Sequence, residues 1–171
     1  MRVFLALICG LTLARCGYHV AGHDAGTIPQ NVQTIYIPAW ENGTVRYKLT
    51  DSIPQDIGRE FIGRTRYKVV TKPDNADAVL TGTILKYYPG PAIFDPVTSR
   101  ASVVQVEVTL SAKLVDKKTG KTLWENGYFS FKQRYEISTT PTAYVEESDA
   151  AIARLSREVA RSVVSAILSN F

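Results

Sequence analysis

Residues 104–114 read Val104-Gln105-Val106-Glu107-Val108-Thr109-Leu110-Ser111-Ala112-Lys113-Leu114, an alternation of apolar and polar side chains. Because successive side chains of a strand point to opposite faces, this pattern predicts a long strand with one buried and one solvent-facing side. The polar segment 116–121 predicts a hairpin loop. Residues 123–135 are predicted to return as the partner strand, with Phe129 and Phe131 on one face. A sheet built around this hairpin is the basis of the fold.

Further strands are predicted upstream of this hairpin, where β-branched and aromatic residues cluster. They occupy residues 32–37, 67–71 and 78–88. Pro89-Gly90-Pro91 predicts the end of the last of these strands, and the segment from there to Arg100 is predicted to be a loop. Residues 41–44 are predicted to form a turn.

Apolar residues at helical spacing predict two helices. The first stripe consists of Val45, Leu49, Ile53, Ile57 and Phe61, and the second of Ile152, Leu155, Val159, Val163 and Ile167. Pro54 lies inside the first stripe, so the helix either starts near Ser52 or is kinked at Pro54; Gly63 is a plausible end. Thr140 and Pro141 are predicted as the cap and first residue of the second helix, which ends near Ser169.

The order of these elements predicts an α+β fold. Each predicted helix has one apolar stripe and must cover something, and the strand at 104–114 has one apolar face to be covered. The sequence therefore predicts two helices packed on one face of a four- to five-stranded, mixed but mostly antiparallel sheet. Its 171 residues, 45% of them hydrophobic, fit a single globular domain at residues 32–171.

The N-terminus has the layout of a secretory signal. Arg2 precedes about a dozen mostly apolar residues, which are too few to span a bilayer as a helix. Leu13-Ala14-Arg15-Cys16 resembles a bacterial lipobox, although Arg15 stands where a small residue is usual. We expect residues 1–15 to be a lipoprotein signal peptide, Cys16 to be the site of lipid attachment, and residues 16–31 to be a tether.

The chain offers little catalytic chemistry. His19 and His23 lie in the predicted tether, and the segment 119–122 lacks the first glycine and the following helix of a phosphate-binding loop. The acidic residues at 146, 147 and 149 are best explained by the positive end of a helix dipole. We expect no catalytic residue, no metal and no cofactor, and therefore no enzyme; a hydrolase has no supporting motif.

Basic residues are the remaining candidates for a binding site. The formal charge of +4 is a small surplus, and no recognition helix or RNA-stacking signature accompanies it, so nucleic acid is not an expected partner. Lys86, Lys132 and Arg134 lie at predicted strand ends. Their aromatic neighbours in the sequence are Tyr87, Tyr88 and Tyr135. Cations flanked by aromatic rings fit a phosphorylated amphiphile.

Three segments of the chain match the pattern of a known family: Cys16-Gly17-Tyr18-His19-Val20-x-Gly22, Ile35-Tyr36-Ile37-Pro38 with Asn42-x-Thr44, and Asp77-Ala78-Val79-Leu80-x-Gly82. With these segments the chain resembles the LptE family of lipopolysaccharide-assembly lipoproteins. This resemblance implies an outer-membrane lipoprotein that plugs and helps assemble the LptD β-barrel and binds lipopolysaccharide. It also implies basic contacts after the third strand and before the last helix, for which Arg100, and then Lys132, Arg134 and Lys86, are the candidates.

A second interpretation stays open. The segment Ala76-Asp77-Ala78-Val79-Leu80-x-Gly82 resembles other periplasmic lipoproteins of similar fold as well. The chain would then be a periplasmic binding module, such as an activator of peptidoglycan synthesis or a curli-type secretion component.

Overall fold

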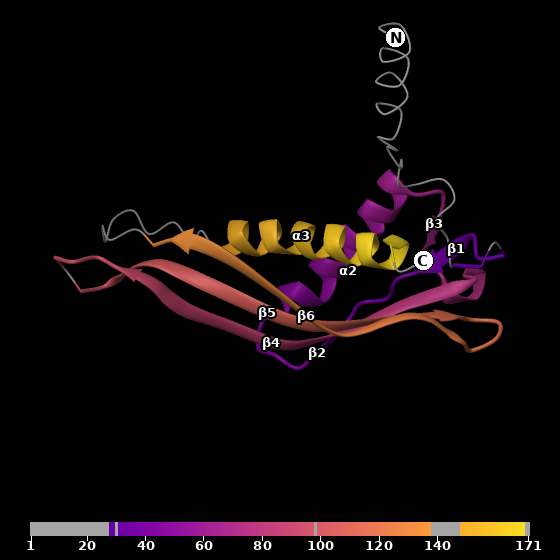
Figure 1. The fold of residues 1–171 in the computed structure, drawn as a ribbon, viewed down its shortest axis with the longest axis horizontal. Coiled ribbons are helices and arrows are strands. Elements are labelled where there is room, and N and C mark those ends of the chain that lie inside the picture. The colour runs from indigo at the N-terminus through magenta and orange to yellow at the C-terminus, as the bar shows by residue number, and fades with distance from the viewer. Residues whose placement is uncertain (1–27, 30, 98, 138–147, 170–171) are drawn as a thin grey trace, which may run out of the picture.

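The computed structural model describes residues 28–29, 31–97, 99–137 and 148–169. Its elements are β1 (Thr34–Tyr36), β2 (Glu41–Asn42), α2 (Lys48–Arg64), β3 (Lys68–Val70), a 3-10 turn (Pro73–Asn75), β4 (Ala78–Phe94), β5 (Ala101–Asp116), β6 (Thr122–Glu136) and α3 (Ser148–Ser169). The strands form one sheet in the order β3-β1-β4-β5-β6, with β2 paired to β4. Both helices cover the same face of this sheet (Figure 1). The predicted α+β class is confirmed.

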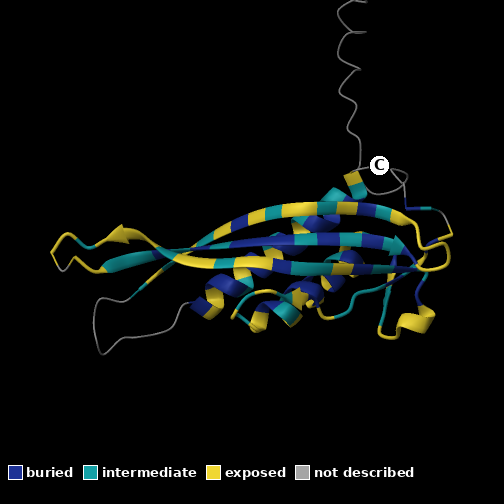
Figure 2. Ribbon diagram, turned by 90° about the horizontal axis from the view of Figure 1, so that it is seen from below, coloured by how far each residue is buried: buried dark blue, intermediate teal, exposed yellow. Residues whose placement is uncertain are grey.

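The alternating row of β5 packs against the helices as the sequence predicts. Its apolar side chains, Val104, Val106, Val108, Leu110, Ala112 and Leu114, are all buried. The stripes of the two helices meet this row, since Leu49, Ile57, Val159 and Ile167 are fully buried in the same core. Seen from the side away from the helices, β5 is the central and most buried strand (Figure 2). The sequence predicts that this side of β5 faces solvent. Only Thr109 on this side is buried, at 5% exposure.

Two bulges keep the neighbouring strands in phase with β5. Ile84 pairs with Leu110 but Lys86 pairs with Thr109, so Leu85 is an extra residue in β4. In β6, two residues lie between Asn126 and Phe129 where the facing stretch of β5 has only Ser111, so β6 also contains one extra residue. An extra residue moves every following side chain to the opposite face of the strand. As a result Trp124, Phe129 and Phe131 line the same core face, with ring centroids 6.0 Å apart along the row.

Three local predictions are corrected by the structure. The Pro89-Gly90-Pro91 segment does not end β4, which continues to Phe94 and pairs with β5 up to Ala101. Beyond its pairing with β2, β4 has a partner on one side only among the described residues, and an edge strand tolerates proline because no bond is required of its outer N–H groups. Residues 41–42, predicted as part of a turn, form the short strand β2.

The third correction concerns α2, which neither starts near Ser52 nor breaks at Pro54. The helix begins at Lys48 and contains Pro54. Proline cannot donate to the carbonyl four residues earlier, which is that of Thr50. That carbonyl instead accepts a hydrogen bond from the backbone N–H of Trp40, at 3.1 Å. A distant segment thus satisfies the group that Pro54 leaves free. Val45, predicted as part of the stripe, precedes the helix and is 84% exposed.

The helices run in the same direction across the sheet. Lys48 at the start of α2 contacts Asp149 at the start of α3, and Arg64 at the end of α2 donates to Ser165 near the end of α3. Between them the hydroxyls of Ser52 and Ser156 are 3.1 Å apart. The predicted cap at residues 140–141 lies outside the described residues, as do the predicted signal peptide and most of the tether.

Trp40 fills a hollow that small residues leave in the core. Gly82 of β4 pairs with Ala112 of β5, and the indole of Trp40 covers Gly82 so closely that an added Cβ would lie 2.4 Å from it. Trp40 is only 2% exposed. Gly82 is therefore required by the packing of the indole.

Asp77, directly before β4, holds β1 next to β4 through hydrogen bonds. One carboxylate oxygen of Asp77 accepts the backbone N–H groups of Gln33 and Thr34, both at 2.9 Å, and the hydroxyl of Thr34 at 2.7 Å. The Thr34 hydroxyl in turn accepts the backbone N–H of Asp77. These bonds lower the pKa of the Asp77 carboxyl, the Thr34 hydroxyl contributing most. Since β1 is only three residues long, these hydrogen bonds are a large part of what holds it in the sheet.

We predict that Gly82→Ala destabilises the protein by about 1–3 kcal/mol, because the added methyl group overlaps the buried indole of Trp40. Gly63→Ala is the matched control: Gly63 lies in α2 with nothing near its Cβ position, so alanine is expected to stabilise the helix by up to about 1 kcal/mol. Urea unfolding of both variants measures the two signs. Equal effects of the two substitutions would contradict the assigned packing.

We predict that Asp77→Asn costs about 1–2 kcal/mol at neutral pH, which is less than the roughly 1.5–3 kcal/mol of a hydrogen bond to a charged group because water reaches this carboxyl. The folded-state pKa of Asp77 is lowered. Its contribution is therefore complete above the unfolded value of about 4 and disappears as the pH falls through the lower folded value. Urea unfolding between about pH 5 and 2 should lose part of its pH dependence in Asp77→Asn. Asp74→Asn, which removes an exposed carboxylate nearby, controls for charge and should cost less at neutral pH.

Candidate functional site

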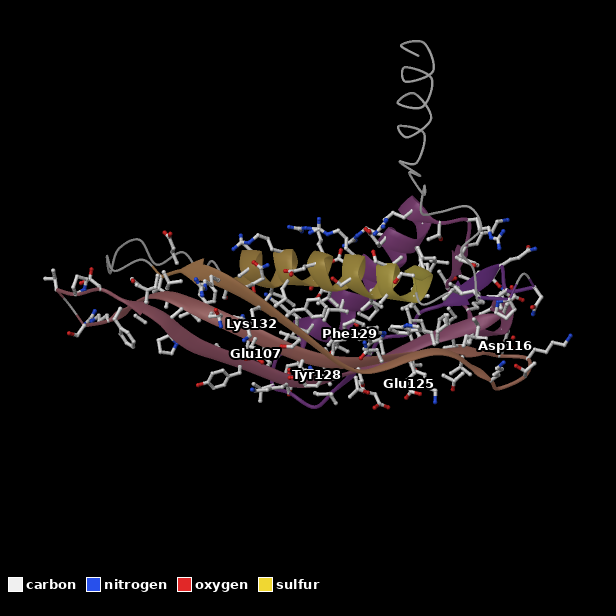
Figure 3. The ribbon with its side chains drawn as sticks, in the orientation of Figure 1. Glu107, Asp116, Glu125, Tyr128, Phe129 and Lys132 are labelled. Atoms are coloured by element: carbon white, nitrogen blue, oxygen red, sulfur yellow. The ribbon has the colours of Figure 1, made fainter. Side chains whose placement is uncertain are left out.

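Three of the four predicted binding residues lie on one surface. Across the sheet, Lys86 pairs with Thr109, and Lys132 and Arg134 pair with Glu107 and Gln105. All three cations project from the side of the sheet that faces away from the helices. We call this surface the basic outer face and define it by Lys86, Tyr88, Gln105, Glu107, Lys132 and Arg134. Figure 3 shows Glu107 and Lys132 next to each other on neighbouring strands.

Both bulges are needed to form the basic outer face. Ile84 points into the core, and without the extra residue Leu85 the side chain of Lys86 would also point inward. Trp124 points into the core, and without the insertion before Phe129 the side chains of Lys132 and Arg134 would do the same. The sequence gives no local signal for the bulge at Leu85, and Gly127 marks the one in β6 without giving its register. The residue types of this surface could thus be predicted, and their common face could not.

The cations of the basic outer face already have weak partners. The Nζ of Lys132 is 4.0 Å from a carboxylate oxygen of Glu107, whose other oxygen accepts the hydroxyl of Ser130 at 3.3 Å. Arg134 donates from Nε to the side-chain oxygen of Gln105 at 3.0 Å. Lys86 lies over the ring of Tyr88, 5.4 Å from its centroid. These contacts are solvent-exposed and weak, so little free energy is lost when an anionic group of a ligand replaces them.

The aromatic neighbours of these cations are only partly as predicted. Tyr88 lies on the basic outer face and is 57% exposed. Tyr87 points to the helix side, where the guanidinium of Arg46 lies 5.8 Å from its ring centroid. Tyr135 pairs with Val104 and packs against the core. Adjacent residues of a strand face opposite ways, so at most one of Tyr87 and Tyr88 was available to this surface.

Arg100 lies apart from the other three, at the end of the β4–β5 hairpin. This hairpin extends beyond the helix layer (Figure 1). Its turn is closed by the N–H of Asp95, which donates to the carbonyl of Arg100 at 2.8 Å. We call residues 93–97 and 99–100 the β4–β5 tip. Its side chains include Ile93, Phe94 and Val97, which are 50%, 59% and 88% exposed. Exposed apolar groups of this size grouped on a protruding hairpin are unusual for a free surface.

A shallow groove that the sequence does not indicate opens beside the break between β1 and β2. Its volume is about 430 Å³, and it is lined by polar residues of three strands, among them Thr81, Thr83, Ser111, Lys113 and Glu125. None of the four predicted binding residues lines it. Finding it from the sequence would require the register of strands far apart in the chain.

The acidic start of α3 has a structural role where it is described. Asp149 lies 2.5 Å from Nζ of Lys48 and 3.8 Å from the guanidinium of Arg46. The bond from Lys48 is the main reason that the pKa of Asp149 is lowered. Residues 146 and 147 lie outside the described ranges. Within those ranges no three His, Cys, Asp or Glu side chains form a metal-binding group, and no helix is long and apolar enough to cross a membrane.

Comparison with solved structures places this fold among bacterial lipoproteins. A lipoprotein B from Nitrosomonas europaea is similar, with a TM-score of 0.55 and 17% identity over 81% of this chain and 85% of that one. A putative lipoprotein from Caulobacter crescentus has a TM-score of 0.52 and 14% identity, covering 77% and 88%. A minor lipoprotein from Acinetobacter baumannii has a TM-score of 0.51 and 12% identity, covering 81% and 92%. At these identities the likeness concerns the fold alone.

Comparison by sequence is more specific. No curated protein matches the chain. The model of one family, described as lipopolysaccharide-assembly, matches residues 32–167, which include every described helix and strand up to the last turn of α3. This range is most of the chain and lies within residues 32–171, where the sequence predicts a single domain. The chain therefore belongs to the lipopolysaccharide-assembly family LptE.

Proposed function

We propose that this protein is an outer-membrane lipoprotein, anchored through Cys16, that plugs and helps assemble an LptD-type β-barrel and binds lipopolysaccharide during its export. Family membership supports the general role in lipopolysaccharide assembly. The observation that carries the finer proposal is that the basic outer face, on β4, β5 and β6, lies next to the apolar tip of the β4–β5 hairpin. The role is non-catalytic: binding and positioning are all that it requires.

The chemistry of the two surfaces matches an acylated and phosphorylated ligand. Lys132 and Arg134 offer cations to phosphate groups, and guanidinium binds phosphate in a bidentate manner. Phe94 and Val97 offer apolar contacts to acyl chains. Arg100 lies among the apolar residues of the tip and offers a further cation there. An amphiphile lying along β4 and β5 would satisfy both surfaces at once.

The shape of the sheet supports the proposed place in a barrel. β5 has 16 residues, which at about 3.3 Å each give a length of about 50 Å. This exceeds the apolar band of an outer-membrane barrel, which is about 25 Å tall. The three long strands make the domain elongated (Figure 1), which suits a protein that lies along the axis of a barrel lumen.

The segment that favours the second interpretation has a structural explanation. Asp77 holds β1 by hydrogen bonds, and Ala78 and Leu80 are fully buried. Gly82 packs against the indole of Trp40. Any protein of this fold can need these residues for the same reasons, whatever it binds. The segment therefore gives no support to a murein-synthase activator or a secretion component over the proposed role.

We predict that Arg100→Glu and the pair Lys132→Gln/Arg134→Gln each weaken lipopolysaccharide binding by about tenfold, the loss of a charge-assisted phosphate contact. The thermal midpoint should stay unchanged, because these side chains are exposed. Lys118→Gln, in the loop at the opposite end of β5, is the control. Titration with purified lipopolysaccharide gives the dissociation constants, and an unchanged value in folded Arg100→Glu would remove that residue from the site.

We predict that mass spectrometry of the mature protein finds Cys16 as an acylated N-terminus, despite Arg15 before it. Cys16→Ala should leave the protein unanchored and absent from the outer-membrane fraction. A tagged wild-type copy, purified from outer membranes, should carry the β-barrel with it. Recovery of murein synthases in place of a barrel would support the second interpretation, and a free Cys16 thiol in membrane-bound protein would contradict the anchor.

A further inference from the structure

The shallow groove beside β2 lies on the same side of the sheet as the basic outer face. Ala112 and Leu114 point into the core, so Lys113 between them points outward. We call this surface the polar groove and define it by six side chains from four strands: Glu41, Thr81, Thr83, Ser111, Lys113 and Glu125. Its volume of about 430 Å³ is within the usual range of small-molecule sites, about 300–1,000 Å³.

The polar groove forms where the chain leaves the sheet between β1 and β2. β1 pairs with β4 up to Val79, and β2 pairs with β4 from Thr83. Between these two residues no described strand lies beside β4 on that side. Pro38 and Ala39, which link β1 to β2, line the resulting gap. The groove is thus built into the topology of the sheet.

The polar groups of the groove have weak partners among the described residues. Lys113 and Glu125 are neighbours across β5 and β6, yet they form no ion pair with each other or with another described side chain. The hydroxyl of Thr83 donates to Glu41 at 3.4 Å, and that of Thr81 donates to the carbonyl of Lys113 at 3.5 Å. Hydrogen bonds of this length are weak, so a ligand can replace them at little cost.

The charge of the polar groove differs from that of the basic outer face. The groove has two carboxylates, Glu41 and Glu125, against the single ammonium of Lys113, whereas the basic outer face has three cations against Glu107. A surplus of carboxylates disfavours phosphate. Carboxylates accept hydrogen bonds, ammonium groups donate them, and Ser and Thr hydroxyls do both. This combination suits an uncharged group that is rich in hydroxyls.

Tyr128 offers an aromatic surface between the groove and the cations. It lies in the bulge of β6 opposite Ser111 and is 66% exposed. Its neighbour Phe129 points toward the core, so Tyr128 points outward. Figure 3 shows Lys132, Tyr128 and Glu125 in this order along β6. Tyrosine combines an apolar ring with a polar tip, which suits the apolar C–H face of a sugar ring.

We propose that the polar groove and Tyr128 bind uncharged core sugars of the lipopolysaccharide whose phosphate groups the basic outer face binds. This inference rests on the proposed function. Ser111 follows Glu107 by four residues on β5, which is about 13 Å, so the groove receives rings beyond the phosphorylated part. Along the outer side of the sheet the order is apolar tip, cations, aromatic ring and hydroxyl groups. A glycolipid lying along β5 has the same order of acyl chains, phosphates and sugars.

The first test is carboxyl footprinting of the full chain with two purified ligands. One is lipopolysaccharide with its core sugars, and the other is lipid A, the acylated and phosphorylated part alone. Carbodiimide labelling of each carboxylate is followed by mass spectrometry. We expect lipopolysaccharide to protect Glu41 and Glu125 from labelling, and lipid A to leave both unprotected. Asp51, exposed on α2, should be labelled equally with either ligand.

The second test measures the dissociation constants of both ligands for four variants. Glu125→Ala and Tyr128→Ala should each weaken lipopolysaccharide binding by about fivefold, the effect of losing one hydrogen bond or one ring contact, and should not weaken lipid A binding. Asp51→Ala and Tyr47→Ala are the matched controls, because each removes an exposed carboxylate or ring outside the groove. Removal of a carboxylate by itself favours an anionic ligand, so net charge cannot explain a loss in Glu125→Ala.

The outcomes separate this inference from the proposed function. Equal affinity of the wild-type protein for the two ligands, with Glu125 unprotected, would overturn the inference and leave the proposed function standing. Failure of both ligands to bind would overturn the proposed function and this inference with it. Protection of Glu125 by lipid A, or by a purified β-barrel without lipopolysaccharide, would assign the polar groove to another partner and would also overturn the inference.

Discussion

The buried row of β5 is the constraint on which the other elements depend. It is paired along both sides, and its apolar side chains must all meet the helix layer. A neighbouring strand that drifts out of phase by one residue would expose its own apolar set, so β4 and β6 each carry an extra residue at the point where phase must be restored. The same two insertions set Lys86, Lys132 and Arg134 outward. Core packing and the proposed binding surface thus share one cause.

Much of the fold could be predicted because its signals are local. Short stretches of sequence contain the alternation of β5, the hairpin loop after it and the apolar stripes of both helices. The structure confirms these elements. The errors have nonlocal causes. Pro54 is tolerated because Trp40 supplies a bond from another element, and β4 continues through two prolines because that stretch is an edge. No window around either proline contains this information.

The candidate site could be predicted by residue type and only in part by position. Lys86, Lys132 and Arg134 do share a face, but the alternation of side chains along each strand could not show it, because the face of each depends on the register of a bulge. Tyr87 points to the helix side because it follows the same bulge. The exposed apolar residues of the β4–β5 tip lie in a segment that the sequence predicts to be an irregular loop, so a hairpin tip was not expected there. Groups distant in sequence, such as Lys86 of β4 and Arg134 of β6, are brought to one face only by the pairing of both strands with β5.

The outer edge of β6 has a consequence for a protein confined to a crowded envelope. Over its 15 residues no described strand pairs with this edge. Such an edge is a template for indiscriminate strand addition and for aggregation. β6 counters this with charged residues at Glu125, Lys132 and Arg134 and with a bulge that interrupts its regular register. Variants that straighten this strand or remove its charges should therefore fail by self-association before they fail by unfolding.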